Sequence, residues 1–212
     1  TEYEYLMRKA DKALYLAKEK GKNRHIIYEE RLHGKLETDD MQNMAMAYAV
    51  SKEKKREAIT EMIVELCVSG VNAIVKNEER LQQIRSLFDL DGITVFSDRG
   101  SNLVCRNGNY MAEVPDVRPE FEDEGYLALF GDDGIFVESN MIRLRSQNPA
   151  AYAVTQEQEI GAALQCLSRK EGIPYTMVNF EVFNRNRKWS DEDVTLLTLL
   201  GHCIGNLLNY SE

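Results

Sequence analysis

The segment near the end of the chain, residues 190–210, constrains the fold more than any other. It opens with Ser190-Asp191-Glu192-Asp193, which resembles a helix capping box with Asp193 in place of the usual Glu. Apolar residues then occupy more than one face of the predicted helix. Because a helix that is apolar nearly all round must be covered on both sides, this helix needs a sheet on one side and a partner helix on the other.

The remaining sequence contains segments of both kinds. Apolar residues at three- and four-residue spacing predict helices over residues 4–20, 41–76 and 77–88. Runs of β-forming residues between turn signals predict strands over residues 25–28, 92–97, 102–105, 126–130, 135–138, 161–168 and 173–182. Asn148-Pro149 places an N-cap residue before a proline, which predicts a further short helix.

Charge is unevenly distributed along the chain. The formal net charge is −9. Residues 1–35 carry nine Lys and Arg against six Asp and Glu, a net of +3, so the remainder carries 17 against 29, a net of −12. Binding to duplex nucleic acid needs a basic face that neutralises phosphates. The acidic main part therefore argues against a nucleic-acid partner.

The four cysteines lie about 40 residues apart and form no C-x-x-C pair: Cys67, Cys105, Cys166 and Cys203. This spacing does not suit a zinc site or a framework of disulfides, and the three histidines have no partner at ligand spacing. We therefore expect no metal and a reduced, cytoplasmic setting. No signal peptide or membrane-spanning apolar run is evident, so no membrane contact is expected from this sequence.

The run Ala10-Asp11-Lys12-Ala13-Leu14-Tyr15-Leu16-Ala17-Lys18-Glu19-Lys20-Gly21-Lys22-Asn23-Arg24 resembles the closing helix and turn of GGDEF domains. These are bacterial diguanylate cyclases, which condense two GTP molecules into cyclic di-GMP. The resemblance implies that Lys18 and Lys22 occupy positions that contact GTP phosphates. The GGDEF turn itself would precede residue 10 and is absent. We therefore expect no catalytic residue and no cofactor in this chain, with GTP and Mg²⁺ belonging to an intact parent cyclase.

A second resemblance covers residues 57–212. A strand from Ala162, the turn at Lys170-Glu171-Gly172 and the aromatic Trp189 before the capped, Leu-rich helix are similar to a GAF domain. The resemblance implies an α+β fold with a six-stranded antiparallel sheet and long N- and C-terminal helices on one face. An orphan helix and strand from the GGDEF domain would precede it. The predicted domains are 1–28 (GGDEF tail), 29–56 (linker and signalling helix) and 57–212 (GAF).

Candidate ligand-pocket residues follow from the alternation of side chains along strands. If the turn at residues 171–172 is tight, Leu164 and Cys166 share one sheet face with the pocket candidates Tyr175, Met177, Asn179 and Glu181. Gln165, Val178, Phe180 and Val182 then share the other. Arg143 and Arg145 would supply charge from a neighbouring segment. A slip of one residue in the pairing would exchange the faces.

These features predict a regulatory GAF module of a cyclic di-GMP signalling protein. It would sense an unknown small ligand, form a homodimer through helices 41–76 and 190–210, or do both, and so control an output domain. One alternative is a ligand-free dimerisation and signal-relay domain. Another is a parent that is itself an active diguanylate cyclase. A third is a GAF-type free methionine sulfoxide reductase using Cys105 and Cys166. A bilin site is disfavoured because His202-Cys203 lies in the closing helix.

Overall fold

The computed structural model describes residues 2–19, 25–33, 38–70, 78–97, 100–106 and 123–210. The chain divides into two compact units, Thr1–Glu53 and Lys54–Glu212. The boundary falls inside a helix, α3 (Thr38–Ser69), which begins in the first unit and ends in the second. The assignment of residues 1–28, 29–56 and 57–212 to a GGDEF tail, a linker with a signalling helix, and a GAF domain stays a prediction.

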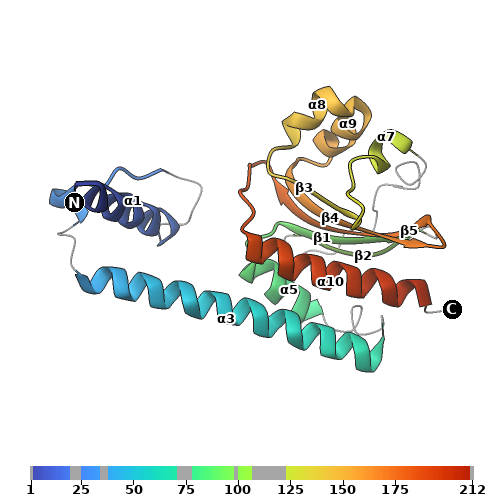
Figure 1. The fold of residues 1–212 in the computed structure, drawn as a ribbon, viewed down its shortest axis with the longest axis horizontal. Coiled ribbons are helices and arrows are strands. Elements are labelled where there is room, and N and C mark those ends of the chain that lie inside the picture. The colour runs from blue at the N-terminus through green and yellow to red at the C-terminus, as the bar shows by residue number, and fades with distance from the viewer. Residues whose placement is uncertain are drawn as a thin grey trace. The chain divides into compact units, whose positions relative to one another are not determined.

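The first unit is helical where the structure describes it (Figure 1). Helix α1 (Glu2–Glu19) matches the helix predicted over residues 4–20. The strand predicted over residues 25–28 is wrong, because residues 25–29 form neither helix nor strand and lead into α2 (Glu30–His33). A strand needs a neighbour to satisfy its backbone groups. Here the Glu29 carbonyl instead accepts hydrogen bonds from the amides of Leu32 and His33 and begins the short helix.

The second unit is built on an antiparallel sheet. The strands are β1 (Gly92–Ser97), β2 (Gly100–Arg106), β3 (Ile135–Glu138), β4 (Ile160–Lys170) and β5 (Ile173–Phe183). Their spatial order is β2-β1-β5-β4-β3, with every neighbouring pair antiparallel. Among the described residues the sheet therefore has five strands, and the prediction of six is corrected.

The strand predicted over residues 126–130 is instead the helix α7 (Glu124–Leu127) and a following turn. Asp123 caps this helix, since its side chain accepts a hydrogen bond from the Tyr126 amide at 2.7 Å. The helical turn brings Tyr126 and Phe130 together edge to face, with ring centroids 5.7 Å apart. Local capping and this aromatic contact thus outweigh the β propensity of the segment.

One face of the sheet is covered by α5 (Glu78–Leu87), α10 (Asp191–Tyr210) and the part of α3 in the second unit (Figure 1). Long helices on one face were expected from the sequence, and the structure has them. Helix α3 ends at Ser69, where Gly70 takes a φ of +63° and its amide bonds to the Leu66 carbonyl. The helix predicted to residue 76 thus stops earlier, and residues 71–77 lie outside the described part.

The core on this face is continuous from helix to sheet. Its largest fully buried side chains come from α3, α5 and the turn after it, β1, β4 and β5, and they include Met62, Leu81, Phe88, Ile93, Leu164 and Phe180. Burying one such side chain stabilises the fold by roughly 1.5–3 kcal/mol. The predicted α10 thus has both kinds of cover that its apolar sequence requires, with sheet on one side and α3 on the other.

The opposite face carries short helices: α7, the 3₁₀ helix η1 (Met141–Arg143), α8 (Leu144–Gln147) and α9 (Pro149–Glu157) (Figure 1). Their apolar side chains form a second, smaller core with the sheet. The predicted N-cap is present, because the Asn148 side chain accepts a hydrogen bond from the Ala151 amide at 3.0 Å. None of the helices in the described ranges combines the length and apolarity needed to cross a membrane.

Candidate functional site

A bulge in the β4–β5 hairpin decides which side chains share a sheet face. Arg169 pairs with Pro174, but the next pair is Ser168 with Thr176, so Tyr175 is an extra residue in β5. Beyond the bulge Gln165 lies opposite Asn179. The prediction from a tight turn was therefore wrong for β4.

Leu164 and Cys166 face the long helices together with Val178, Phe180 and Val182. Gln165 joins Met177, Asn179 and Glu181 on the other face. The prediction for β5 is confirmed beyond the bulge, because Met177, Asn179 and Glu181 lie on the face opposite to Val178, Phe180 and Val182. Asn179 and Glu181 are therefore not covered by α3, α5 and α10.

A row of buried polar side chains crosses the middle of the face that carries the short helices. We call it the polar row, and it consists of Thr94, Gln165, Asn179 and Glu181. The Thr94 hydroxyl donates to the Glu181 carboxylate at 2.9 Å. The Tyr126 hydroxyl from α7 donates to Gln165 Oε1 at 2.7 Å. Burying a polar group without a hydrogen-bond partner costs free energy, and these two hydrogen bonds supply partners for Thr94, Glu181 and Gln165.

One buried atom of the polar row has no hydrogen-bond partner among the described residues. The side-chain oxygen of Asn179 is buried, and no described residue donates a hydrogen bond to it. An unsatisfied buried acceptor costs roughly 1–3 kcal/mol. Together with the Glu181 carboxylate, it makes this face rich in hydrogen-bond acceptors. A small molecule with N–H or O–H donors would match that chemistry.

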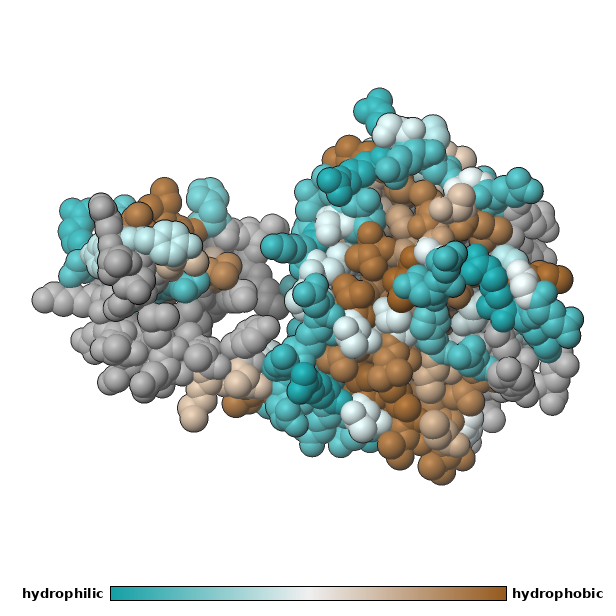
Figure 2. Space-filling view, in the orientation of Figure 1, coloured by the Kyte–Doolittle hydropathy of each residue, from teal (hydrophilic) through white to brown (hydrophobic). Residues whose placement is uncertain are grey.

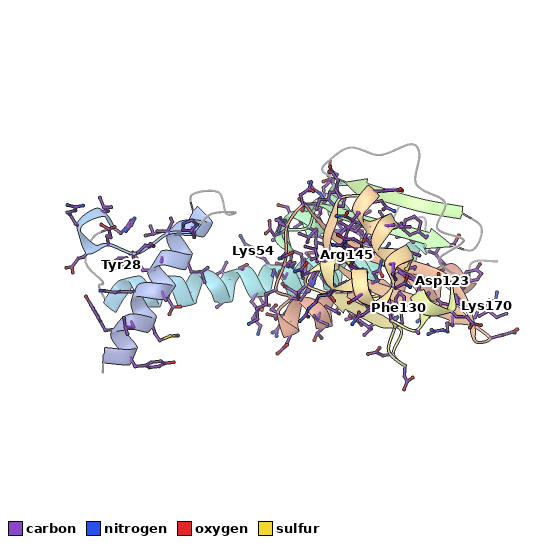
Figure 3. The ribbon with its side chains drawn as sticks, turned by 90° about the horizontal axis from the view of Figure 1, so that it is seen from above. Tyr28, Lys54, Asp123, Phe130, Arg145 and Lys170 are labelled. Carbon is purple, nitrogen blue, oxygen red and sulfur yellow. The ribbon has the colours of Figure 1, made fainter. Side chains whose placement is uncertain are left out.

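The two arginines proposed from the sequence do not lie in the polar row. Arg143 in η1 and Arg145 in α8 are both exposed, and Arg143 approaches the Glu138 carboxylate at 4.0 Å. Figure 3 looks down on this layer of short helices and labels Arg145 there. Arg143 therefore reaches the edge strand β3 rather than the centre of the sheet, because η1 and α8 follow β3 directly in the chain.

The other sequence candidates are dispersed. Met177 is fully buried in the smaller core, and the Tyr126 hydroxyl oxygen lies 3.8 Å from its sulfur. Tyr175 lies at the bulge near the hairpin tip, where the Lys170 ammonium nitrogen lies 5.5 Å from the centroid of its ring. Lys22 lies outside the described residues, and of Lys18 only the backbone, in α1, is described.

Sequence reasoning missed Thr94, Gln165 and Tyr126 as members or supports of the polar row. A usable signal was present for the first two. Each is a single polar residue inside an apolar strand, in Ile93-Thr94-Val95 and Leu164-Gln165-Cys166. No such signal was present for Tyr126, because its segment was predicted to be a strand.

A separate open cleft lies at the end of β4 and β5. Its volume is about 380 Å³. Four side-chain amides line it, from Asn140, Gln156, Asn184 and Asn186, together with Met141, Ile142, Tyr152, Glu159, Ile160, Gly161 and Arg185. Gly161 is an extra residue in β4, and a Cβ there would lie 2.4 Å from the Arg185 carbonyl oxygen. The guanidinium of Arg185, one of the lining residues, pairs with the Asp91 carboxylate at 3.1 Å.

The described thiols all belong to the side of the long helices. Cys166 is in the core beneath α10, Cys203 is in α10, and Cys67 is in α3. Burial raises the pKa of Cys166 to about 12. None of these three thiols therefore meets the polar row. No group of three or more His, Cys, Asp or Glu side chains suited to a metal ion occurs in the described ranges.

Comparison with solved structures shows that this fold is similar to that of chromophore-binding domains. No family model and no curated protein matches the chain by sequence. The chromophore-binding domain of a Stigmatella aurantiaca bacteriophytochrome is 14% identical, with a TM-score of 0.56 over 74% of this chain and 60% of that one. The corresponding domain of an unusual R. palustris bacteriophytochrome is 12% identical, with a TM-score of 0.53 over 74% and 62%.

A third similar structure is a far-red-absorbing protein with bound biliverdin, 13% identical, with a TM-score of 0.51 over 71% of this chain and 97% of that one. The chain thus spans about three-fifths of the two bacteriophytochrome domains. At this identity the likeness concerns the fold alone. The second unit has a GAF-like fold, with an antiparallel sheet between two layers of helices.

Proposed function

We propose that this chain is a regulatory module of a cyclic di-GMP signalling protein that binds a small molecule over the polar row. The observation that carries the proposal is the buried Asn179 side-chain oxygen, which no described residue satisfies, beside the Glu181 carboxylate. The ligand would be a small molecule whose N–H or O–H groups reach these acceptors. The GAF-like fold supports a sensory role, since the similar domains are described as binding chromophores.

The link to cyclic di-GMP rests on the first residues alone. The run from Ala10 to Arg24 resembles the end of a GGDEF domain, and helix α1 covers its first ten residues. We propose that a cyclase domain precedes this module in the parent protein. The chain itself is proposed to be non-catalytic.

A covalently attached bilin does not fit the described residues on the face of the polar row. Covalent attachment would need a thiol on the face of the polar row, and the three described cysteine side chains all belong to the helix side of the sheet. The same geometry removes Cys166 from a methionine sulfoxide site on that face. The side chain of Cys105 lies outside the described part.

Native mass spectrometry of the purified chain tests the ligand proposal, because it reports bound molecules and oligomeric state together. We expect a fraction of the protein to retain a small molecule, or to gain one from a panel of cyclic nucleotides and metabolites. Asn179→Ala should lower the bound fraction while Asn206→Ala, at an exposed position on α10, leaves it unchanged. A chain that stays ligand-free throughout would favour the alternative of a dimerisation and signal-relay domain.

We also propose a homodimer through α3 and α10. Three large apolar side chains are exposed on these helices: Val64 at 55%, Val68 at 81% and Leu199 at 54%. Figure 2 shows apolar surface gathered over the same region of the second unit. Large exposed apolar patches mark interaction sites, and these side chains support the proposed interface. Val68→Lys should shift the protein toward monomer in sedimentation velocity, whereas Ala153→Lys, at an exposed position of α9 on the opposite face of the sheet, should not.

A further inference from the structure

The open cleft at the end of β4 and β5 has the size of a small-molecule site. Its volume is about 380 Å³, and ligand pockets in proteins span roughly 300–1,000 Å³. Three segments that are distant in the sequence line it: η1, the stretch from α9 into β4, and the residues that follow β5. The cleft and the polar row share no residue, so the cleft is a candidate for a separate site.

The backbone that borders the cleft is held in an unusual conformation. Glu159 and Asn184 both line the cleft and have φ values of +59° and +53°. The Asn184 amide donates to the Glu159 carbonyl at 2.8 Å, and Arg187 donates its amide to the Ser139 carbonyl at 3.0 Å, beside η1. Left-handed backbone is unfavourable for residues with a Cβ, and such residues concentrate at ligand-binding sites. These hydrogen bonds preform the shape of the cleft.

The charged side chains of the lining already have partners. The Arg185 guanidinium contacts the Asp91 carboxylate at 3.1 Å and donates to the Asp89 carbonyl at 3.0 Å. The Glu159 carboxylate accepts a hydrogen bond from the Asn184 side-chain amide at 3.0 Å. A charged ligand would lose part of its hydration here without finding an unengaged opposite charge. The lining therefore favours an uncharged ligand.

Several neutral polar groups of the lining remain available to a ligand. The side-chain amides of Gln156 and Asn186 and the hydroxyl of Tyr152 make no hydrogen bond within the part of the chain that the structure describes. Each amide offers an acceptor and two donors, and the hydroxyl both donates and accepts. The apolar side chains of Met141 and Ile142 lie in the same lining. Hydroxyl groups on a ring with C–H faces match this combination.

We propose that the cleft is a second binding site and that it takes an uncharged polyhydroxy molecule of monosaccharide size. The amides of Gln156 and Asn186 would each exchange hydrogen bonds with hydroxyl groups of the ligand. The C–H face of the ligand would pack on Met141 and Ile142. The proposal goes beyond the ligand of the polar row and does not rest on it.

The test titrates the full chain with glucose and with N-acetylglucosamine, followed by saturation-transfer difference NMR. We expect saturable binding of at least one of these uncharged sugars. Glucuronate and glucosamine carry a carboxylate and an ammonium group on a similar ring, and we expect them to bind at least about tenfold more weakly, because the cleft does not compensate their lost hydration.

Two pairs of variants locate the binding. Gln156→Ala and Asn186→Ala should each weaken it by roughly two- to tenfold, the range expected for the loss of one hydrogen bond. Glu157→Ala, in the same helix as Gln156, and Lys188→Ala, two residues after Asn186, change exposed side chains outside the lining and should leave it unchanged. The unfolding midpoint of each variant verifies that it is folded.

Three results would overturn the proposal: no binding of either uncharged sugar, equal binding of the charged sugars, or binding that neither Gln156→Ala nor Asn186→Ala weakens. The polar row has its own readout, which is retention of a ligand in native mass spectrometry and its loss in Asn179→Ala. Failure of the cleft and failure of the polar row are therefore distinguishable.

Discussion

Asp193 forms the most enclosed ion cluster among the described residues of the second unit. Its carboxylate contacts Lys55 Nζ at 2.6 Å and the Arg187 guanidinium at 2.9 Å, and the Asp193 and Arg187 side chains are only 9% and 10% exposed. Arg187 also stacks over Trp189 at 4.3 Å and donates to the Phe88 carbonyl. Burial lowers the pKa of Arg187, while Asp193 opposes that shift. The cluster joins α3, the turn after α5 and the start of α10.

Replacing Asp193 with Ala should therefore destabilise the second unit strongly. Removing one partner of a buried pair leaves an uncompensated charge and costs about 3–5 kcal/mol. Urea denaturation followed by circular dichroism measures the loss. Asp191→Ala is the matched control, because Asp191 is an exposed acidic residue in the same helical turn. A loss below about 1 kcal/mol for Asp193→Ala, the size expected of a surface pair, would contradict the assignment.

Cys166 should be unreactive in the folded protein. Burial raises its pKa from 9.0 to about 12, so at pH 8 its thiolate is roughly a thousandfold rarer than that of an ordinary thiol. Iodoacetamide labelling read by peptide mass spectrometry should modify Cys67 and spare Cys166 until urea unfolds the chain. Labelling of Cys166 at native conditions would show that the core beneath α10 opens readily.

The same shift predicts how Cys166 contributes to stability at high pH. The unfolded chain releases this proton near pH 9 while the folded chain retains it to about pH 12. The folded state then binds more protons, so the free energy of unfolding falls as the pH rises from about 9 toward 12. Below pH 9 the contribution is constant. Stability measured against pH should show this decline only above pH 9, and a fall on acidification is not expected from this thiol.

At the scale of elements, turns and bulges determine how the strands meet. Gly134 precedes β3 with a φ of +73°, and a Cβ there would lie 2.4 Å from the Leu167 carbonyl oxygen in β4. Its own carbonyl accepts a hydrogen bond from the Leu167 amide at 2.7 Å. Gly172, in the β4–β5 turn, has a similar φ of +86° but open space around it.

These two glycines form a matched pair for mutation. Gly172→Ala should cost only about 1–2 kcal/mol, the cost of a left-handed conformation for a residue with a Cβ. Gly134→Ala adds a clash with backbone that is fixed by the sheet, and we expect it to lose roughly 2 kcal/mol more. Thermal unfolding of both variants compares them directly. Equal losses would mean that β3 can move away from β4 without cost.

The elements also show what local sequence can and cannot predict. Helix α10 was predicted with its cap, and the Asp193 amide does bond to Ser190 Oγ at 3.1 Å. The reciprocal half of the box is absent, because the Asp193 carboxylate binds Lys55 and Arg187 instead. The strands β4 and β5 were predicted, but the bulge at Tyr175 was not, and it moved Gln165 to the other face.

At the scale of the whole molecule, two units follow one another along the chain. The second unit, Lys54–Glu212, contains both hydrophobic cores, the sheet and the polar row. The first unit exposes large apolar side chains instead, with Leu6 at 57%, Leu14 at 55% and Ile27 at 76%. A unit that contains its own core can fold by itself.

We therefore expect residues 54–212 to fold when expressed without residues 1–53. The shortened chain should unfold in a single cooperative transition, with the same midpoint as the second unit of the full chain. Circular dichroism against temperature measures this. A broad, non-cooperative transition would show that residues 1–53 contribute to the core.

The sequence by itself determined the kind and approximate bounds of most elements and the two-sided cover that α10 requires. These follow from apolar spacing, caps and turn residues, which act within a few positions of the chain. Tertiary structure decided the order of the strands and the face on which Gln165 lies. Bulges and helix pairs depend on packing between distant segments, and for that reason no local pattern in the sequence predicts them.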